Sequence, residues 1–301
     1  MAMTNTFYNH DQKEQFLSNS PNAKRLITIF GNSYNYECRK DRDLYHWTTD
    51  EYICFLAENR IITAIQFNIY KSSIREYLKH FNINTDKIDR IKLNDVHDYV
   101  VDNNISIFFM SMGELVRNIQ LATTQYFRDD EDVYRTNTIT TCAVLLYCGL
   151  TFDEATSIDR LSVANYGVSK CALPTKITNK MVASIINEYA RKNINWVDDL
   201  RTDSVLLRNM KNGEEPLTIS AFKRHLVDIN RYSPYDITLS NIRLSGEFYR
   251  LYQKDISKGE DTKICYDDFN KISKAEFIKY NIKSIETQYI LYCRLMKTMW
   301  L

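Results

Sequence analysis

A threonine stands three residues ahead of a glutamate or glutamine at the start of several apolar runs in this chain. The pairs are Thr48 with Glu51, Thr63 with Gln66 and Thr151 with Glu154. In this spacing the threonine hydroxyl accepts from a free backbone N–H at a helix start, and the second side chain reaches back to the backbone of the threonine. Each pair predicts the start of a helix, so together they favour a mainly helical fold.

The chain also has few turn-forming residues, with seven glycines and four prolines among 301 residues. Many-stranded sheets need more tight turns than helices do, so this scarcity again favours helices. Hydrophobic residues at 44% and charged residues at 26% exclude intrinsic disorder and collagen-like or linker composition. At roughly 150 residues per domain, the length predicts two domains, each with its own core.

We expect three segments along the chain. Residues 1–45 form a short helical arm that docks apolar side chains, residues 46–128 form a helical domain, and residues 129–301 form a second domain. The boundary lies at four consecutive carboxylates, Asp129 to Asp132, because like charges at this density resist compaction. The apolar residues of the arm are Phe16, Leu17, Leu26, Ile27 and Phe30.

Further helices are predicted over residues 94–103, 111–127, 137–148, 179–191, 219–229, 239–253, 274–280 and 284–297. The segment 137–148 is apolar enough to be buried, and Gly149 stands at its expected C-terminal cap. Residues 160–178 are rich in branched and aromatic side chains around Gly167, which predicts a small sheet of two or three strands. The expected fold class is mainly α with a small β-sheet, in two domains.

Seven cysteines occur without a Cys-x-x-Cys pair or a histidine cluster. This pattern favours reduced thiols over disulfides or a metal site, with Cys142 and Cys148 in the core. The N-terminal residues are polar, and no stretch of about 18 apolar residues occurs. We therefore expect a cytoplasmic protein without a membrane span, a metal or a cofactor.

A net charge of +1 excludes a uniformly basic protein, so a nucleic-acid surface requires local segregation of charge. Lys71, Arg75 and Lys79 recur every four residues along a predicted helix. This stripe is interpreted either as a solvated helix face or as a contact to a phosphate backbone. The other candidates for DNA contact are Arg160, Lys170, Lys176, Lys180, Lys223, Arg224 and Arg243.

Four stretches, in order, resemble the tyrosine recombinases, the family of the phage integrases. WTTDEYICFLAEN, followed by a helix ending YLKHFNIN, is similar to their DNA-clamping core-binding domain. LLYCGLTFDEATSI is similar to the stretch with the first catalytic arginine, and ITLSNIRLSGEFY to the His-x-x-Arg helix. NIKSIETQYILY is similar to the motif that ends in the nucleophilic tyrosine. The resemblance covers roughly residues 44–297 and implies a helical core-binding domain followed by an integrase catalytic-like domain.

The recombinase reaction requires two arginines that neutralise the phosphate and a lysine or histidine that protonates the leaving group. In this chain Thr151 occupies the position of the first arginine, and Ser240 and Ile282 occupy histidine positions. Arg243 matches the second arginine and is interpreted either as a phosphate anchor or as an internal ion-pair partner.

The family spacing places the nucleophile at Leu291, between Tyr289 and Tyr292. With 21 tyrosines in the chain, a tyrosine near this position is expected by chance, so a structural role is the alternative. Lys170 or Lys176 can replace the hairpin lysine of the family.

With these departures, the resemblance implies an integrase-fold protein that keeps a DNA clamp and has lost catalysis, similar to the integrase-fold repressors of lysogeny in SPbeta-type phages. The expected function is sequence-specific binding of double-stranded operator DNA in a bacterial host, with a regulatory protein partner that relieves repression. One alternative is an active, diverged recombinase. Another is a protein-interaction adaptor without DNA affinity. The oligomeric state stays open.

Overall fold

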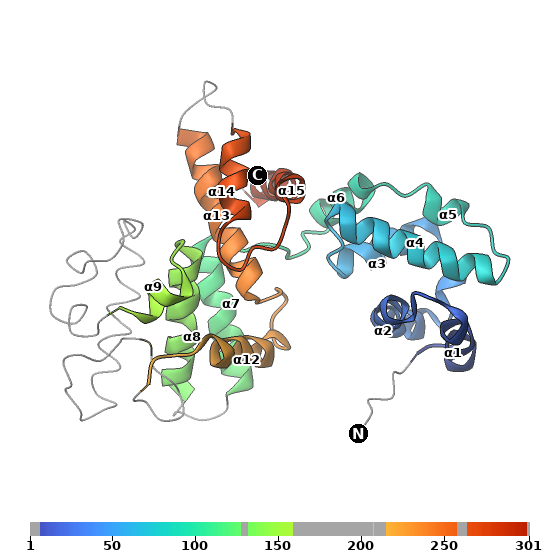
Figure 1. The fold of residues 1–301 in the computed structure, drawn as a ribbon, viewed down its shortest axis with the longest axis horizontal. Helices are drawn as coiled ribbons and strands as arrows, with labels where there is room; N and C mark the ends of the chain where they lie inside the picture. Colours follow the sequence, from blue (N-terminus) through green and yellow to red (C-terminus); the bar gives the residue numbers. More distant parts are fainter. Residues whose placement is uncertain (1–6, 128–131, 159–206, 208–214, 258–263, 300–301) are drawn as a thin grey trace. The chain divides into compact units, whose positions relative to one another are not determined.

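The computed structural model describes residues 7–127, 132–158, 207, 215–257 and 264–299 (Figure 1). The chain forms two compact units, one of Met1–Ile105 with Glu286–Leu301 and the other of Ser106–Ile285. Within the described ranges the regular elements are helices, and none of these helices is long and apolar enough to cross a membrane. The mainly helical class is confirmed, whereas the sheet expected within 160–178 lies outside the described residues.

The first unit contains six complete α-helices, one short 3-10 helix and most of α15 (Ile282–Met299). The complete elements are α1 (His10–Asn19), α2 (Ala23–Lys40), η1 (Leu44–His46), α3 (Thr49–Glu58), α4 (Ala64–His80), α5 (Asp86–Asp89) and α6 (Leu93–Asp102). Thr48 forms a complete capping box with Glu51 at the start of α3, and the Thr63 side chain accepts from the backbone N–H of Gln66 at the start of α4. Both predicted helix starts are confirmed.

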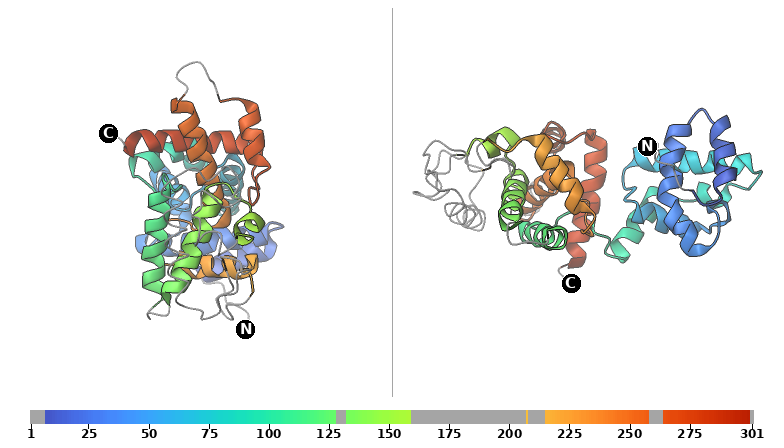
Figure 2. Two further views of the ribbon diagram at one scale, coloured as in Figure 1. Left: turned by 90° about the vertical axis from the view of Figure 1, so that its left-hand side faces the viewer. Right: turned by 90° about the horizontal axis from the view of Figure 1, so that it is seen from below.

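The described part of the expected arm, residues 7–45, contributes instead to the core of this unit. Phe16, Leu26 and Phe30 are at most 4% exposed. The Phe30 and Phe16 rings lie 4.9 and 5.2 Å from the ring of Tyr77 on α4. Full burial of a side chain of this size contributes about 1.5–3 kcal/mol, so α1 and α2 are integral to the unit. Figure 2 shows both helices beside α4.

The second unit is built around α8. Its helices are α7 (Met112–Tyr126), α8 (Asp132–Tyr147), α9 (Phe152–Thr156), α12 (Ile219–Asn230), α13 (Leu239–Ser257), α14 (Tyr266–Ser273) and the first residues of α15 (Ile282–Met299). Residues 138–147 are all buried, which confirms the predicted buried helix. Both α7 and α13 pack along α8.

Two glycines shape the end of α8. Gly149 has a φ of +102°, a left-handed conformation that favours glycine, and it ends the helix as expected. A Cβ on Gly246 of α13 would lie 1.9 Å from the Tyr147 carbonyl oxygen. Only glycine therefore allows α13 to approach the end of α8 this closely.

Most of the predicted helices have counterparts in the structure. The expectations at 94–103, 111–127, 219–229, 239–253 and 284–297 correspond to α6, α7, α12, α13 and α15, and 179–191 lies outside the described residues. The helix expected at 274–280 is wrong. Asp268 Oδ2 accepts from the Cys265 backbone N–H at 3.2 Å, so α14 starts earlier. This helix ends at Ser273, and Phe277 has a φ of +68°, a left-handed conformation that no α-helix over 274–280 could contain.

Candidate nucleic-acid interface

At the position that the resemblance gives to the first arginine, Thr151 caps the short helix α9. Thr151 Oγ1 accepts from the Glu154 backbone N–H at 3.2 Å, and Glu154 Oε2 accepts from the Thr151 N–H at 2.7 Å. Glu276 Oε2 accepts the next N–H, that of Phe152, at 2.6 Å. Two carboxylates thus occupy the positive end of this helix, where they repel a phosphate.

Arg243, at the second arginine position, is 6% exposed on α13. Its Nη1 donates to the carbonyl oxygens of Leu150 and Leu146, and its Nε lies 3.1 Å from Glu247 Oε1. Leu146 lies in the last turn of α8 and Leu150 follows the helix by three residues, so both carbonyls lie at the negative end of the helix dipole. The geometry favours the internal ion-pair interpretation of Arg243.

Arg250, on the same side of α13, extends this cluster. Its Nη1 donates to the Tyr147 carbonyl oxygen, and its Nη2 lies 2.8 Å from the same Glu247 oxygen that Arg243 faces.

The charge of Arg243 is kept in this cluster. Burial lowers the pKa of Arg243, and the Glu247 carboxylate opposes that shift. The guanidinium stays charged because its ordinary pKa is far above neutral. Two arginines and one glutamate therefore neutralise the end of α8.

The two histidine positions carry side chains of different character. Ser240 is half-buried on α13, and its hydroxyl hydrogen-bonds the Tyr280 phenol, whose pKa is raised by burial. Ile282 is the half-buried first residue of α15. An aliphatic side chain cannot protonate a leaving group, and a serine hydroxyl is a far weaker acid than an imidazolium.

The two tyrosines beside the nucleophile position are buried in the first unit. Tyr289 is 4% exposed and Tyr292 is 0% exposed. Their rings stack with centroids 6.3 Å apart and planes 13° apart. Both phenols are thus enclosed by protein, which favours their structural interpretation.

The basic stripe on α4 is largely used inside the first unit. Lys71 Nζ donates to the carbonyl oxygens of Asp89 and Ile91, both at 2.7 Å. Arg75 Nε donates to Asp89 Oδ1 at 2.8 Å. The Thr85 hydroxyl first, and Arg75 after it, hold the pKa of Asp89 below its usual range. Lys79 is exposed. Lys71 and Arg75 therefore hold the α5 segment against α4, and Lys79 remains a candidate for DNA contact.

The remaining candidates fall into two groups. Lys223 and Arg224 are exposed on α12. The other four, Arg160, Lys170, Lys176 and Lys180, lie outside the described residues. DNA contact by all six stays a prediction.

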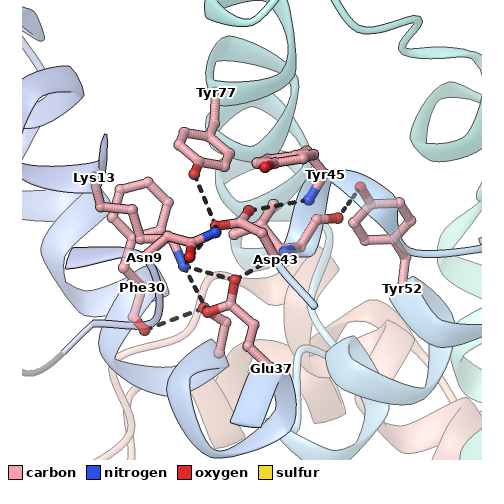
Figure 3. A network of polar contacts seen from close by, with 10 residues as sticks. Asn9, Lys13, Phe30, Glu37, Asp43, Tyr45, Tyr52 and Tyr77 are labelled. Atoms are coloured by element: carbon pink, nitrogen blue, oxygen red, sulfur yellow. Dashed lines mark hydrogen bonds and ion pairs between the residues drawn. The ribbon is translucent and has the colours of Figure 1, made fainter. Parts of the chain in front are cut away.

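Sequence reasoning missed a buried charge cluster in the first unit (Figure 3). The Lys13 side chain on α1 is 0% exposed, and its Nζ lies 2.6 Å from both carboxylate oxygens of Glu37 and 3.5 Å from Asp43 Oδ2. The same ammonium lies 5.1 Å from the centre of the Phe30 ring. We call Lys13, Glu37 and Asp43 the buried triad.

The carboxylates of the triad have further donors. Glu37 accepts from the Ser33 hydroxyl and the Leu44 backbone N–H, both at 2.8 Å. Asp43 accepts from the Tyr77 hydroxyl at 3.1 Å and the Asn9 amide at 3.2 Å. Burial raises the pKa of Glu37, and the Lys13 ammonium opposes the rise. The network ties α1, α2, η1 and α4 together.

A pattern in the sequence does indicate two members of this triad, Lys13 and Glu37. Glu37 lies on the same face of α2 as Leu26, Phe30 and Ser33, at steps of three or four residues, and all four are buried. Lys13 lies three residues before the buried Phe16 on α1. One acid and one base, each within the apolar face of neighbouring helices, predict a buried pair.

The cysteines of the described ranges are free thiols. Cys142 is fully buried on α8, where burial raises the pKa of its thiol. Burial also raises the pKa of Cys148 to about 11. Both thiols lie in or beside the core, as expected.

Residues 7–82 match the family model for the N-terminal core-binding domain of MrpR. This range runs from the start of the described chain to the end of α4 and contains the whole buried triad. The match supports DNA binding by the first unit. The matched range includes residues before 46 together with α3 and α4.

No curated protein sequence matches the chain. Among solved structures, XerA recombinase aligns with 96% of this chain and 98% of its own, at 12% identity and a TM-score of 0.32. A TM-score this low does not establish a common fold.

Proposed function

We propose that this protein binds double-stranded DNA sequence-specifically without cleaving it and represses transcription. DNA binding is supported by the match of residues 7–82 to a core-binding domain. The absence of cleavage is supported by one observation above the others, the enclosure of Arg243 between Glu247 and the carbonyl end of α8.

Cleavage by tyrosine develops negative charge on the phosphate oxygens, which donors must already face. Here Thr151 replaces one donor, and Arg243 is used internally. The loss of one such donor typically costs about 2.7–4 kcal/mol of transition-state stabilisation. Two losses, together with the carboxylates of Glu154 and Glu276 beside the same site, leave little support for the reaction.

A protein that holds DNA without changing it acts by occupancy. We therefore infer an operator-binding repressor, and the resemblance to integrase-fold repressors points to the maintenance of phage lysogeny in the cytoplasm of a bacterial host. A regulatory protein that relieves repression completes this proposal.

The test uses DNA fragments that the purified full-length protein retains from phage and host genomic DNA, in intact and singly nicked form. Wild type, Tyr289→Phe and Tyr292→Phe are incubated with each fragment and run on denaturing gels. We expect no protein-linked strand in any sample, and we expect both variants to bind within about twofold of wild type, because each keeps its ring. A covalent band in wild type that a Phe variant lacks would instead identify a diverged recombinase.

A further inference from the structure

We propose that the exposed face of α2 reads base edges in the major groove of DNA. This inference rests on the proposed DNA binding and adds the element that provides sequence specificity. The stripe consists of Lys24, Thr28, Gly31, Asn35 and Arg39, all exposed. We call it the α2 stripe.

The stripe has the composition of a groove-reading surface. Its members recur at steps of three or four residues, so they fall on one side of the helix. Lysine and arginine at the two ends suit phosphates, and the small polar residues between them suit base edges. At 1.5 Å per residue, Lys24 and Arg39 are about 22 Å apart along the axis, enough to cross a major groove about 12 Å wide.

Helix α2 itself adds no exposed negative charge to this stripe. Glu37 is the one acid in α2, and it lies on the inner face, 0% exposed and paired with Lys13. Near the stripe, Glu58 lies 3.3 Å from Arg39, with side chains 43% and 65% exposed. A pair this exposed contributes little, so a phosphate can displace Glu58 from Arg39.

At Gly31 the stripe has no side chain, so the helix backbone is most accessible there. A Cβ added at Gly31 would meet no atom within 4 Å, so neither packing nor the backbone requires glycine there. A glycine inside a helix lowers stability relative to alanine, and close approach of another molecule to the backbone is a reason to keep it. The open site lies between Thr28 and Asn35, the two residues suited to base contact.

Three other helices of this unit, α1, α3 and α6, are less suited to DNA. The exposed residues of α1 include Asp11 and Glu14, those of α3 include Asp50, and those of α6 include Asp98 and Asp102. Each of these carboxylates repels a phosphate backbone. The α2 stripe combines two exposed bases with no acid of its own.

The residue types also predict what is read. An asparagine pairs bidentately with the N6 and N7 positions of adenine, and a threonine methyl contacts the methyl group of thymine. We therefore expect Asn35 to select an A·T pair at a defined position of the bound sequence, and Thr28, seven residues away on the helix, to contact a different position.

The experiment selects bound sequences from a pool of random 24-base-pair duplexes, with full-length wild type, Asn35→Ala and Asn68→Ala. Asn68 is an exposed asparagine on α4 and serves as the matched control. We expect Asn35→Ala to lose preference at one A·T position and to bind the wild-type sequence about tenfold or more weakly, because a bidentate base contact is removed. Asn68→Ala should recover the wild-type sequence with unchanged affinity.

A second variant tests the same face without removing a contact. Gly31→Gln should raise the melting temperature, since glutamine is a better helix former in open space, and should lower affinity for the selected sequence at least tenfold. Unchanged sequence and affinity in both Asn35→Ala and Gly31→Gln would overturn the inference while DNA binding stands. No retention of any duplex by wild type would overturn the proposed function itself.

Discussion

The first unit encloses a lysine between two carboxylates, whereas the second encloses an arginine against a glutamate and the carbonyl end of a helix. In the first unit, Lys13 and Glu37 pair on the inner side of α2, and the outer side of that helix keeps its bases exposed. In the second unit, Arg243 lies at a position where a recombinase needs a phosphate ligand, and its donors face inward.

The two buried cations differ in how free the surface beside them is to bind DNA. An arginine whose donors already bind helix carbonyls and a carboxylate must break those contacts before it binds a phosphate. The α2 stripe has no such requirement, apart from the exposed pair of Arg39 with Glu58. We therefore expect variants in the second cluster to change stability and variants on the outer face of α2 to change DNA binding.

The largest effect is expected from Lys13→Met. Removing one partner of a buried ion pair leaves an uncompensated charge and typically costs about 3–5 kcal/mol. Both carboxylates of the buried triad would then lie enclosed without their cation. Urea unfolding of the full chain measures the loss, and hydrogen exchange of α2 peptides locates it in the first unit.

The double variant Lys13→Met with Glu37→Gln is the control, because it removes one charge of each sign. We expect it to be more stable than Lys13→Met alone. A loss below about 1 kcal/mol in Lys13→Met would show that the triad contributes no more than an exposed ion pair does.

A smaller effect is expected from Arg243→Met in the second unit. Hydrogen bonds to a charged group typically contribute about 1.5–3 kcal/mol, and Glu247 keeps Arg250 as a partner in the variant. Urea unfolding should show a loss in this range, with faster hydrogen exchange in peptides of α8. DNA affinity per folded molecule should stay at the wild-type value.

Arg224→Met is the matched control, since Arg224 is an exposed arginine on α12. It should leave stability within about 0.5 kcal/mol of wild type. If Arg243→Met weakens DNA binding uniformly across sequences and melts like wild type, Arg243 is a phosphate anchor after all.

The smallest effect is a loss of stability in mild acid, expected in both units. Burial lowers the pKa of His97 in the first unit and of His225 in the second. The unfolded chain then binds a proton more readily than the folded chain, so stability falls as pH drops from about 7 to 5.5. Each histidine contributes a slope of at most about 1.4 kcal/mol per pH unit.

The variant His97→Gln distinguishes the contribution of His97 in the first unit to acid sensitivity from that of His225 in the second. His97 Nε2 lies 2.9 Å from the Ile62 carbonyl oxygen, and a glutamine amide keeps a donor for it. Urea unfolding at pH 7, 6.5, 6 and 5.5 should show a shallower slope in His97→Gln than in wild type. An unchanged slope would mean that His97 contributes nothing to the acid sensitivity, leaving His225 and other groups to account for it.

Helix starts were predictable because they depend on neighbouring residues. The capping boxes at Thr48 and Thr151 both form, and Gly149 ends α8 as its position predicts. The missed features depend on contacts between distant residues. Lys13 and Glu37 are 24 positions apart, and Arg243 meets Leu146 across 97 positions, so no local pattern sets their geometry.

The error at 274–280 has a similar origin. Its apolar spacing fits a helix, but the chain turns at Phe277 with a left-handed φ of +68°. Glu276, in the same segment, is directed to the N-terminus of α9, 124 positions away. A tertiary contact of this kind outweighs local helix preference.

If this chain holds DNA through its phosphates, its affinity for a duplex must fall steeply as salt concentration rises. Affinity of the full-length protein for its retained fragments is measured between 50 and 300 mM salt. About five phosphate contacts predict a log–log slope near −4.5, because each neutralised phosphate releases counterions. A slope near zero, or no binding at 50 mM salt, would contradict the account.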